Sequence, residues 1–166
     1  MDTGERPNAG SFEELSSLMI ETYRHCKNYI VDKEVLDVGC GEGAQDLFMA
    51  DVAKHIHGID YDEGLILENK NKFSQAKNIT FYHMSGDQMT FDDSSFDVVI
   101  SSQSIEHIDD DKRFVREVHR VLKPGGIFIC TTPNKLSLIP EGEEEYDAPY
   151  YPYHFREYRP EQFFGL

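Results

Sequence analysis

Apolar residues recur at helical spacing near the start of the chain. They run from Phe12 to Ile30, and Ser11 and Glu14 have the spacing of a capping box, which satisfies backbone groups at the start of a helix. The pattern predicts an amphipathic helix within an N-terminal helical segment, residues 1–32.

Short apolar runs alternate with helical patterns through the middle of the chain. The runs that predict strands cover residues 35–38, 55–60, 78–84, 96–102 and 127–132. Helical spacing lies between them, over residues 44–53, 63–74 and 109–123. The fifth strand is nearly all apolar, as is typical of a parallel strand buried on both faces. This alternation predicts a doubly wound α/β sheet.

The pattern changes after Pro133. Five of the seven prolines and five of the nine tyrosines fall between Pro133 and Pro160, and no periodicity remains. Such a segment is either a solvated loop or a lid beyond the carboxyl end of a strand. We therefore expect a core of residues 33–134, then a loop or lid and the start of a truncated C-terminal region in residues 135–166.

Composition narrows the class of protein. The length of 166 residues suits one domain, and 16 basic against 31 acidic side chains give a net charge of −15. This charge repels phosphate backbones, so nucleic acid is not expected as a partner. The longest apolar runs fall far short of the ~20 residues that a membrane span needs. Three cysteines without a repeating spacing predict reduced thiols in a cytoplasmic protein.

A glycine-rich turn follows the first predicted strand. Gly39, Gly41 and Gly43 allow a tight turn and the close approach of a ligand to the backbone. Together with Ala44 the run also has the spacing G-x-G-x-x-A of dinucleotide sites, and Asp60 lies about twenty residues further on, where such sites bind ribose. The glycines alone therefore leave NAD(P) as a possible ligand.

Acidic residues around this turn favour a cationic ligand. The carboxylates of Asp37 and Glu42 would oppose a pyrophosphate at the helix N-terminus. S-adenosylmethionine (SAM) has no phosphate and carries a sulfonium and an ammonium group, which an acidic residue attracts. Asp37 therefore favours SAM over NAD(P).

Four blocks of the sequence resemble class I SAM-dependent methyltransferases of the type 11 group, over residues 33–134. They are residues 35–43, 57–60, 85–97 and 122–126, which resemble the first motif, the end of the second strand, the adenine-contacting stretch and the last motif of that group. The resemblance implies a Rossmann-like sheet of order 3-2-1-4-5, lacking the usual C-terminal strands. It implies SAM as cofactor and S-adenosylhomocysteine as product.

The resemblance also implies a set of cofactor-binding residues. They are Asp37, Gly39, Cys40, Gly41, Asp60, Tyr61, Gly86, Asp87, Gln88 and Gln103. Asp37 and the backbone of Gly39 and Gly41 would hold the methionine end. Asp60 would accept hydrogen bonds from the ribose hydroxyls and Asp87 from the adenine amine, because a carboxylate is an acceptor.

His107 is the candidate catalytic residue. It forms a Glu-His pair with Glu106 that is common in this group, and a histidine of near-neutral pKa can take a proton from an acceptor hydroxyl or amine. The alternative is that His107 only packs at the start of the following helix. His55 and His57 share one face of a strand, but no carboxylate or thiol completes a ligand set there, so no metal site is expected.

The expected function is transfer of a methyl group to a small-molecule, lipid or sugar acceptor. The alternatives are a catalytically incomplete SAM-binding domain that acts as sensor or subunit, and an NAD(P)-dependent oxidoreductase. Related chains extend beyond the fifth strand, so an exposed sheet edge would allow a homodimer here. The segment from Glu141 to Tyr158, rich in tyrosine, is expected to fold over the cofactor cleft as a lid.

Overall fold

The structure is a computed structural model that describes residues 17–139 and 147–166. Its strands are β1 (Glu34–Val38), β2 (His55–Asp60), β3 (Ile79–His83), β4 (Phe96–Ser102) and β5 (Leu122–Thr131). Its helices are α1 (Ser17–Cys26), α2 (Ala44–Met49), α3 (Glu63–Lys72), the 3-10 turn η2 (Ile105–His107), α4 (Asp111–Val121), α5 (Lys135–Leu138) and α6 (Pro160–Phe163).

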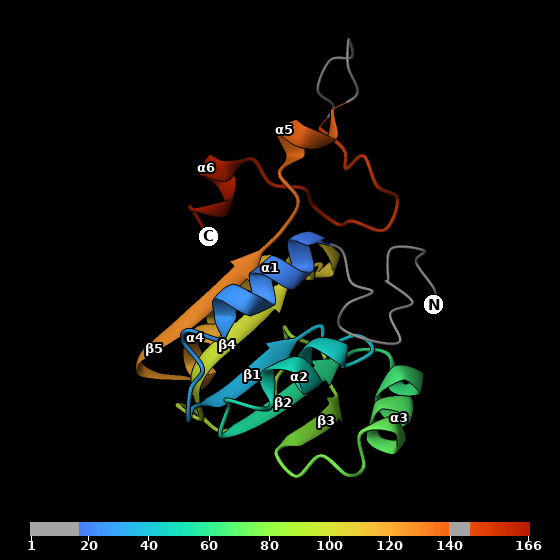
Figure 1. Cartoon of the computed structure of the whole chain (residues 1–166). Helices are drawn as coiled ribbons and strands as arrows, with labels where there is room; N and C mark the ends of the chain where they lie inside the picture. Colours follow the sequence, from blue (N-terminus) through green and yellow to red (C-terminus); the bar gives the residue numbers. More distant parts are fainter. Residues whose placement is uncertain (1–16, 140–146) are drawn as a thin grey trace.

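The five strands form one parallel sheet of order β3-β2-β1-β4-β5, which confirms the predicted topology (Figure 1). The chain reverses its direction of travel across the sheet at β1, which lies between β2 and β4. In open sheets of this kind the ligand binds beyond the carboxyl ends of the strands at that switch point. The topology therefore places the glycine turn after β1 at the position of a ligand site.

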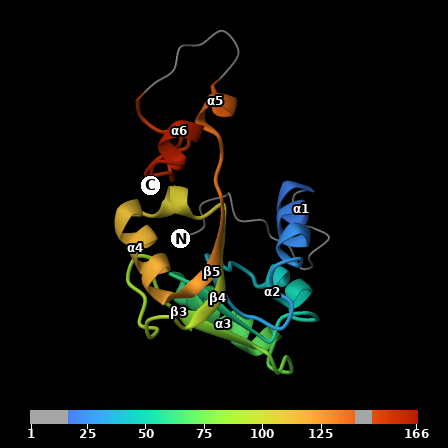
Figure 2. The same cartoon turned by 90° about the vertical axis from the view of Figure 1, so that its left-hand side faces the viewer.

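Helices cover both faces of the sheet (Figure 2). On one face, α1 and α2 bury Tyr23, Cys26 and Met49 against β1, β2 and β4. On the other face, α4 buries Phe114 and Val118 against β1 and β4. This two-sided cover explains the almost unbroken apolar character of the central strands.

Aspartate side chains fix the starts of two helices. Asp62 accepts hydrogen bonds from the backbone N–H groups of Gly64 and Leu65 before α3. Asp110 accepts one from the N–H of Arg113 before α4. Each cap satisfies backbone donors that the first helical turn leaves without a partner, so the two strand-to-helix connections begin at defined residues.

The fifth strand differs from its prediction in length and in burial. It begins at Leu122 instead of Ile127, and its register against β4 shifts between Phe96 and Val98, which accommodates Gly125 at a φ of +80°. Among the described residues β5 pairs only with β4, so it is an edge strand, and Ile127 is 39% exposed. The expectation of burial on both faces was therefore wrong.

The ends of the chain fulfil their predictions in part. α1 ends at Cys26, before the predicted stripe does, although Ile30 is buried in the same cluster as Tyr23 and Cys26. The capping box at Ser11 and Glu14 lies outside the described residues. The short helix α6 begins at Pro160. The first part of the predicted lid, 141–146, also lies outside the described residues. No described helix has the length and apolar character needed to cross a membrane.

Candidate functional site

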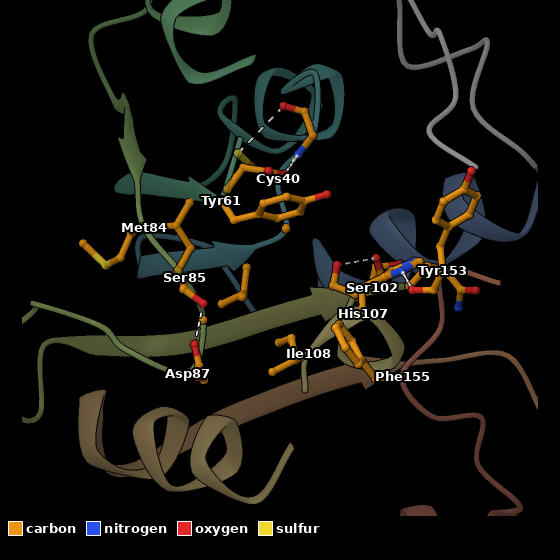
Figure 3. A pocket seen from close by; sticks show the side chains of 18 of the residues that line it. Cys40, Tyr61, Met84, Ser85, Asp87, Ser102, His107, Ile108, Tyr153 and Phe155 are labelled. Carbon is orange, nitrogen blue, oxygen red and sulfur yellow. Dashed lines mark hydrogen bonds between the residues drawn. The ribbon is translucent and has the colours of Figure 1, made fainter. Parts of the chain in front are cut away.

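A pocket of about 840 Å³ opens at the carboxyl ends of β1, β2 and β4 (Figure 3). Most of the predicted cofactor-binding residues line it. These are Gly39, Cys40, Gly41, Asp60, Tyr61, Gly86, Asp87 and Gln103. His107 lines the pocket as well, next to Tyr153 and Phe155 of the C-terminal segment. The fold thus brings residues from six separate stretches of sequence to one cavity.

The glycine turn leaves room for a ligand at one position and is tightly packed at another. A Cβ on Gly39 would lie 2.2 Å from Oγ of Ser104, so the turn needs glycine there to pass the loop after β4. A Cβ on Gly41 would meet no atom within 4 Å, and this residue has a φ of +51°. Gly41 therefore borders open space in which a ligand can approach the backbone.

Asp60 holds the turn from the end of β2. Its Oδ2 accepts a hydrogen bond from the N–H of Gly41 at 3.1 Å, and its Oδ1 accepts one from the N–H of Asp62 at 3.0 Å. Asn69 of α3 donates to the carbonyl of Gly41 at 2.7 Å. Because carboxylate oxygens accept more than one hydrogen bond, Asp60 can still bind hydroxyl groups of a ligand.

The loop after β3 forms another part of the pocket wall. Asp87 accepts a hydrogen bond from the hydroxyl of Ser85, and a Cβ on Gly86 would lie 2.8 Å from Val38 at the end of β1. This close packing carries Asp87 to the pocket. Gln88, which the sequence also placed at the cofactor, is exposed and is not among the lining residues.

Asp37 lies beneath the pocket and does not line it. Its side chain is 0% exposed and accepts a hydrogen bond from the Tyr23 hydroxyl at 3.5 Å. Burial raises the pKa of Asp37 to about 7 and raises the pKa of the neighbouring Asp46 well above its ordinary value. The contact of this carboxylate with the methionine end of the cofactor therefore stays a prediction.

The two histidines of β2 have a carboxylate neighbour that the sequence did not suggest. Nε2 of His57 lies 3.5 Å from Oε2 of Glu34, and burial lowers the pKa of His57. Nε2 of His55 contacts the hydroxyl of Thr80 at 2.8 Å. Both rings thus take part in hydrogen bonds within the sheet, away from the pocket.

Sequence reasoning missed a cluster at the other end of the pocket, around His107. Nδ1 of His107 lies 3.1 Å from the carbonyl oxygen of Tyr153, and the His107 and His154 rings are 5.0 Å apart. Glu106, which is 1% exposed, accepts a hydrogen bond from the Thr132 hydroxyl at 2.9 Å. Only the Glu-His pair signalled this place in the sequence.

A buried carboxylate organises the C-terminal segment beside His107. Glu157 accepts hydrogen bonds from the N–H groups of Tyr150 and Tyr151 at 2.9 and 3.0 Å. Its Oε1 also lies 2.9 Å from Nδ1 of His154. The N–H of Phe155 donates to the carbonyl of Glu106 at 2.8 Å. These contacts fix the segment against η2, so it forms part of the pocket wall.

Acidic groups dominate the charged residues of the pocket. Glu42, Asp60, Asp87 and Asp109 all line it, whereas no lysine or arginine does so among the described residues. A pyrophosphate would face these carboxylates without a cationic partner. The pocket therefore suits a neutral or positively charged ligand.

Comparison with known proteins identifies the family. Residues 36–130 match the profile of a family described as methyltransferase domain. A probable S-adenosylmethionine-dependent methyltransferase of Mycolicibacterium smegmatis is 35% identical, over 93% of this chain and 58% of its own length. A demethylmenaquinone methyltransferase of Staphylococcus epidermidis is 30% identical, over 63% of this chain and 45% of its own length.

Solved structures show the same fold. The YcgJ protein of Bacillus subtilis superposes with a TM-score of 0.73 at 22% identity, over 87% of this chain and 65% of its own. The curated relatives above are longer, and the chain spans about half of their length. Because the family profile covers more than half of the sequence, this chain belongs to the methyltransferase domain family.

Proposed function

We propose that this chain binds SAM in the pocket and directs its methyl group to a small-molecule acceptor. The observation that carries the proposal is the open space beside Gly41, in a pocket that Asp60 and Asp87 also line. An acidic pocket at the switch point of the sheet fits a cationic cofactor without phosphates. Both curated relatives named above are methyltransferases, which supports the same function.

Different residues of the pocket would bind different parts of the cofactor. Asp60 would accept hydrogen bonds from the ribose hydroxyls, and Asp87 would accept one from the adenine amine. The backbone of Gly39 and Gly41 would hold the methionine end. Bound SAM supplies an electrophilic methyl group on a sulfonium. The acidic wall favours this positive charge over a dinucleotide.

The C-terminal segment would form the acceptor side. Tyr153 and Phe155 line the pocket next to His107. Glu157 accepts hydrogen bonds from the backbone just before them, and the N–H of Phe155 donates to Glu106. Aromatic side chains there would exclude water and orient the acceptor, which together lower the barrier of a methyl transfer. Because Nδ1 of His107 donates to a carbonyl, the lone pair of its neutral ring is on Nε2, where it can accept a proton from a hydroxyl or amine.

A domain that binds SAM without catalysis is the second candidate. It would share the cofactor end of the pocket and lack a usable acceptor end. A transfer assay with methyl-labelled SAM separates the two functions, with demethylmenaquinol, a catechol and a hexose as representative acceptors. Label in at least one acceptor supports the enzyme. SAM binding without label in any acceptor supports the binding domain.

Gly41→Val is the matched site variant for that assay. It would place a branched side chain into the open space beside the turn, at a φ that such residues rarely adopt. Gly125→Val, at a φ of +80° with equally open space but remote from the pocket, is the control for backbone strain. We expect loss of SAM binding and transfer in the first variant only. Equal loss in both would show that strain, and not the cofactor cradle, is responsible.

A further inference from the structure

We propose that Glu106, His107 and His154 bind a divalent transition-metal cation at the end of the pocket that Tyr153 and Phe155 line. Each residue offers one ligand atom, and these atoms all lie within 4.8 Å of one another. Ligand atoms on one cation lie about 3.0–3.6 Å apart at the usual bond angles, because each metal–ligand bond is about 2.0–2.2 Å long. Rotation of these side chains would therefore draw all three atoms onto one ion.

The hydrogen bonds around this cluster prepare the ligand atoms. Nδ1 of His107 donates to the carbonyl of Tyr153 at 3.1 Å, which leaves the lone pair of the neutral ring on Nε2. Nδ1 of His154 lies 2.9 Å from Oε1 of Glu157, which fixes the same tautomer. Metal-binding histidines characteristically donate their other ring nitrogen to a carbonyl or a carboxylate in this way.

The carboxylate of the cluster is held as firmly. Glu106 is 1% exposed, and its Oε2 accepts a hydrogen bond from Thr132 at 2.9 Å. A buried carboxylate beside two imidazoles is costly unless protons or a cation balance its charge. A divalent cation balances the charge of the carboxylate and binds the Nε2 lone pair of each histidine.

The donor set indicates the class of ion and its use. Two imidazole nitrogens and one carboxylate oxygen suit the cations from Mn²⁺ to Zn²⁺. Three protein ligands leave further positions for an oxygen of the ligand in the pocket, as in catalytic metal sites. His107 and His154 both line the pocket, so those positions face it.

The role of the ion rests on the proposed function. A cation lowers the pKa of a bound hydroxyl, so the acceptor would be a phenol, an enol or a sugar hydroxyl that ligates through oxygen. Nε2 of His107 would then bind the ion, and the hydroxyl proton would leave to solvent. The expectation of no metal site considered only His55 and His57, which are remote from this cluster.

Metal binding is measured on the whole chain without SAM. After removal of metals with EDTA, we expect equimolar binding of Zn²⁺, Co²⁺ and Mn²⁺ by calorimetry, and a visible Co²⁺ spectrum typical of nitrogen and oxygen ligands. His107→Gln, His154→Gln and Glu106→Gln should each weaken binding at least about tenfold. His119→Gln, on the exposed side of α4, is the control and should change nothing.

A second readout uses the unmodified chain and so does not depend on how the variants fold. Substoichiometric Mn²⁺ should broaden the imidazole NMR signals of His107 and His154 and leave those of His55 and His119 sharp. Absence of saturable binding, or equal broadening of all histidine signals, overturns the proposal. A chain that binds SAM and no cation overturns this inference alone, and one that binds the cation and no SAM overturns the proposed function alone.

Discussion

The carboxylate of Asp60 accepts a hydrogen bond from the backbone N–H of Gly41, with 3.1 Å between Oδ2 and the nitrogen. This contact joins the end of β2 to the turn after β1, and the same side chain lines the pocket. One residue therefore shapes the cofactor cradle and offers oxygens to the cofactor. Its removal should affect both.

Asp60→Asn replaces one acceptor oxygen by an amide donor while keeping the side-chain size. We expect SAM affinity to fall by about 1.5–3 kcal/mol, the range for hydrogen bonds to a charged group. Calorimetry measures this, with the exposed turn residue Asp92→Asn as the control. Unchanged affinity in Asp60→Asn would show that Asp60 does not contact the cofactor.

Asp37 and Asp46 form a buried carboxyl pair that should couple stability to pH. Neither side chain is exposed, and with both ionised Oδ1 of Asp37 and both oxygens of Asp46 lack a hydrogen-bond donor among the described residues. A proton on Asp46 supplies one donor to Asp37. Burial accordingly raises the pKa of Asp37 to about 7 and that of Asp46 well above its ordinary value.

The sign of the pH effect follows from proton counts. In the unfolded chain both carboxyls have a pKa of about 4, so between about pH 4 and 7 the folded chain holds more protons. The free energy of unfolding therefore falls as pH rises, by up to about 1.4 kcal/mol per pH unit for each extra proton. Asp46→Asn keeps a donor without a titrating group and should flatten this slope. Urea denaturation measures the free energy of unfolding of the unmodified chain and of Asp46→Asn at several pH values. The same pH dependence in both proteins would rule out the shared proton.

Glu157 should control how firmly the C-terminal segment is held. It accepts hydrogen bonds from two backbone N–H groups and contacts His154, and its side chain is fully buried. Glu157→Gln retains one oxygen and should speed chymotrypsin cleavage at Tyr150, Tyr153 and Phe155. The exposed Glu161→Gln is the control.

Ligand binding should act on the same cleavage sites. If the segment is a lid, S-adenosylhomocysteine together with an acceptor should slow cleavage at these sites in the unmodified chain. The reason is that a protease cuts the segment only while it is open, and bound ligands would make the open state rarer. Mass spectrometry of the fragments measures the rates. Equal rates with and without ligands would make the segment a fixed wall of the pocket.

The edge of β5 is expected to pair with a second copy of the chain. Among the described residues β5 has only β4 as neighbour, and an unpaired strand edge attracts another strand. Ile127→Lys should convert a dimer to a monomer in light scattering. Val31→Lys, at a more exposed apolar position remote from β5, should leave the mass unchanged. A wild-type monomer at about 100 µM would refute pairing through this edge.

Local signals explain which parts of the fold the sequence predicts. The apolar run 35–38, followed by three glycines, places β1 and the turn. The alternation with helices predicts a doubly wound sheet, and the family resemblance implies its strand order. The start of β5 escaped prediction because Pro124 and Gly125 look like a turn. They form a bulge that the pairing with β4 carries.

Non-local contacts explain what the sequence concealed. Asp46 has the position of a solvated residue in the first turn of α2, but the fold buries it completely beside Asp37. His154 lies in an aperiodic segment far along the chain from Glu106. The two residues come together where the side chain of Glu157 accepts hydrogen bonds from the backbone of this segment, and no periodicity or motif indicates those bonds.

Parallel calorimetric titration of the unmodified chain with SAM, S-adenosylhomocysteine, NADH and NADPH tests the central claim most directly. The acidic pocket beside Gly41 predicts saturable, equimolar binding of SAM and S-adenosylhomocysteine and no binding of either dinucleotide. Saturable binding of NADH or NADPH with no signal from SAM would contradict the account.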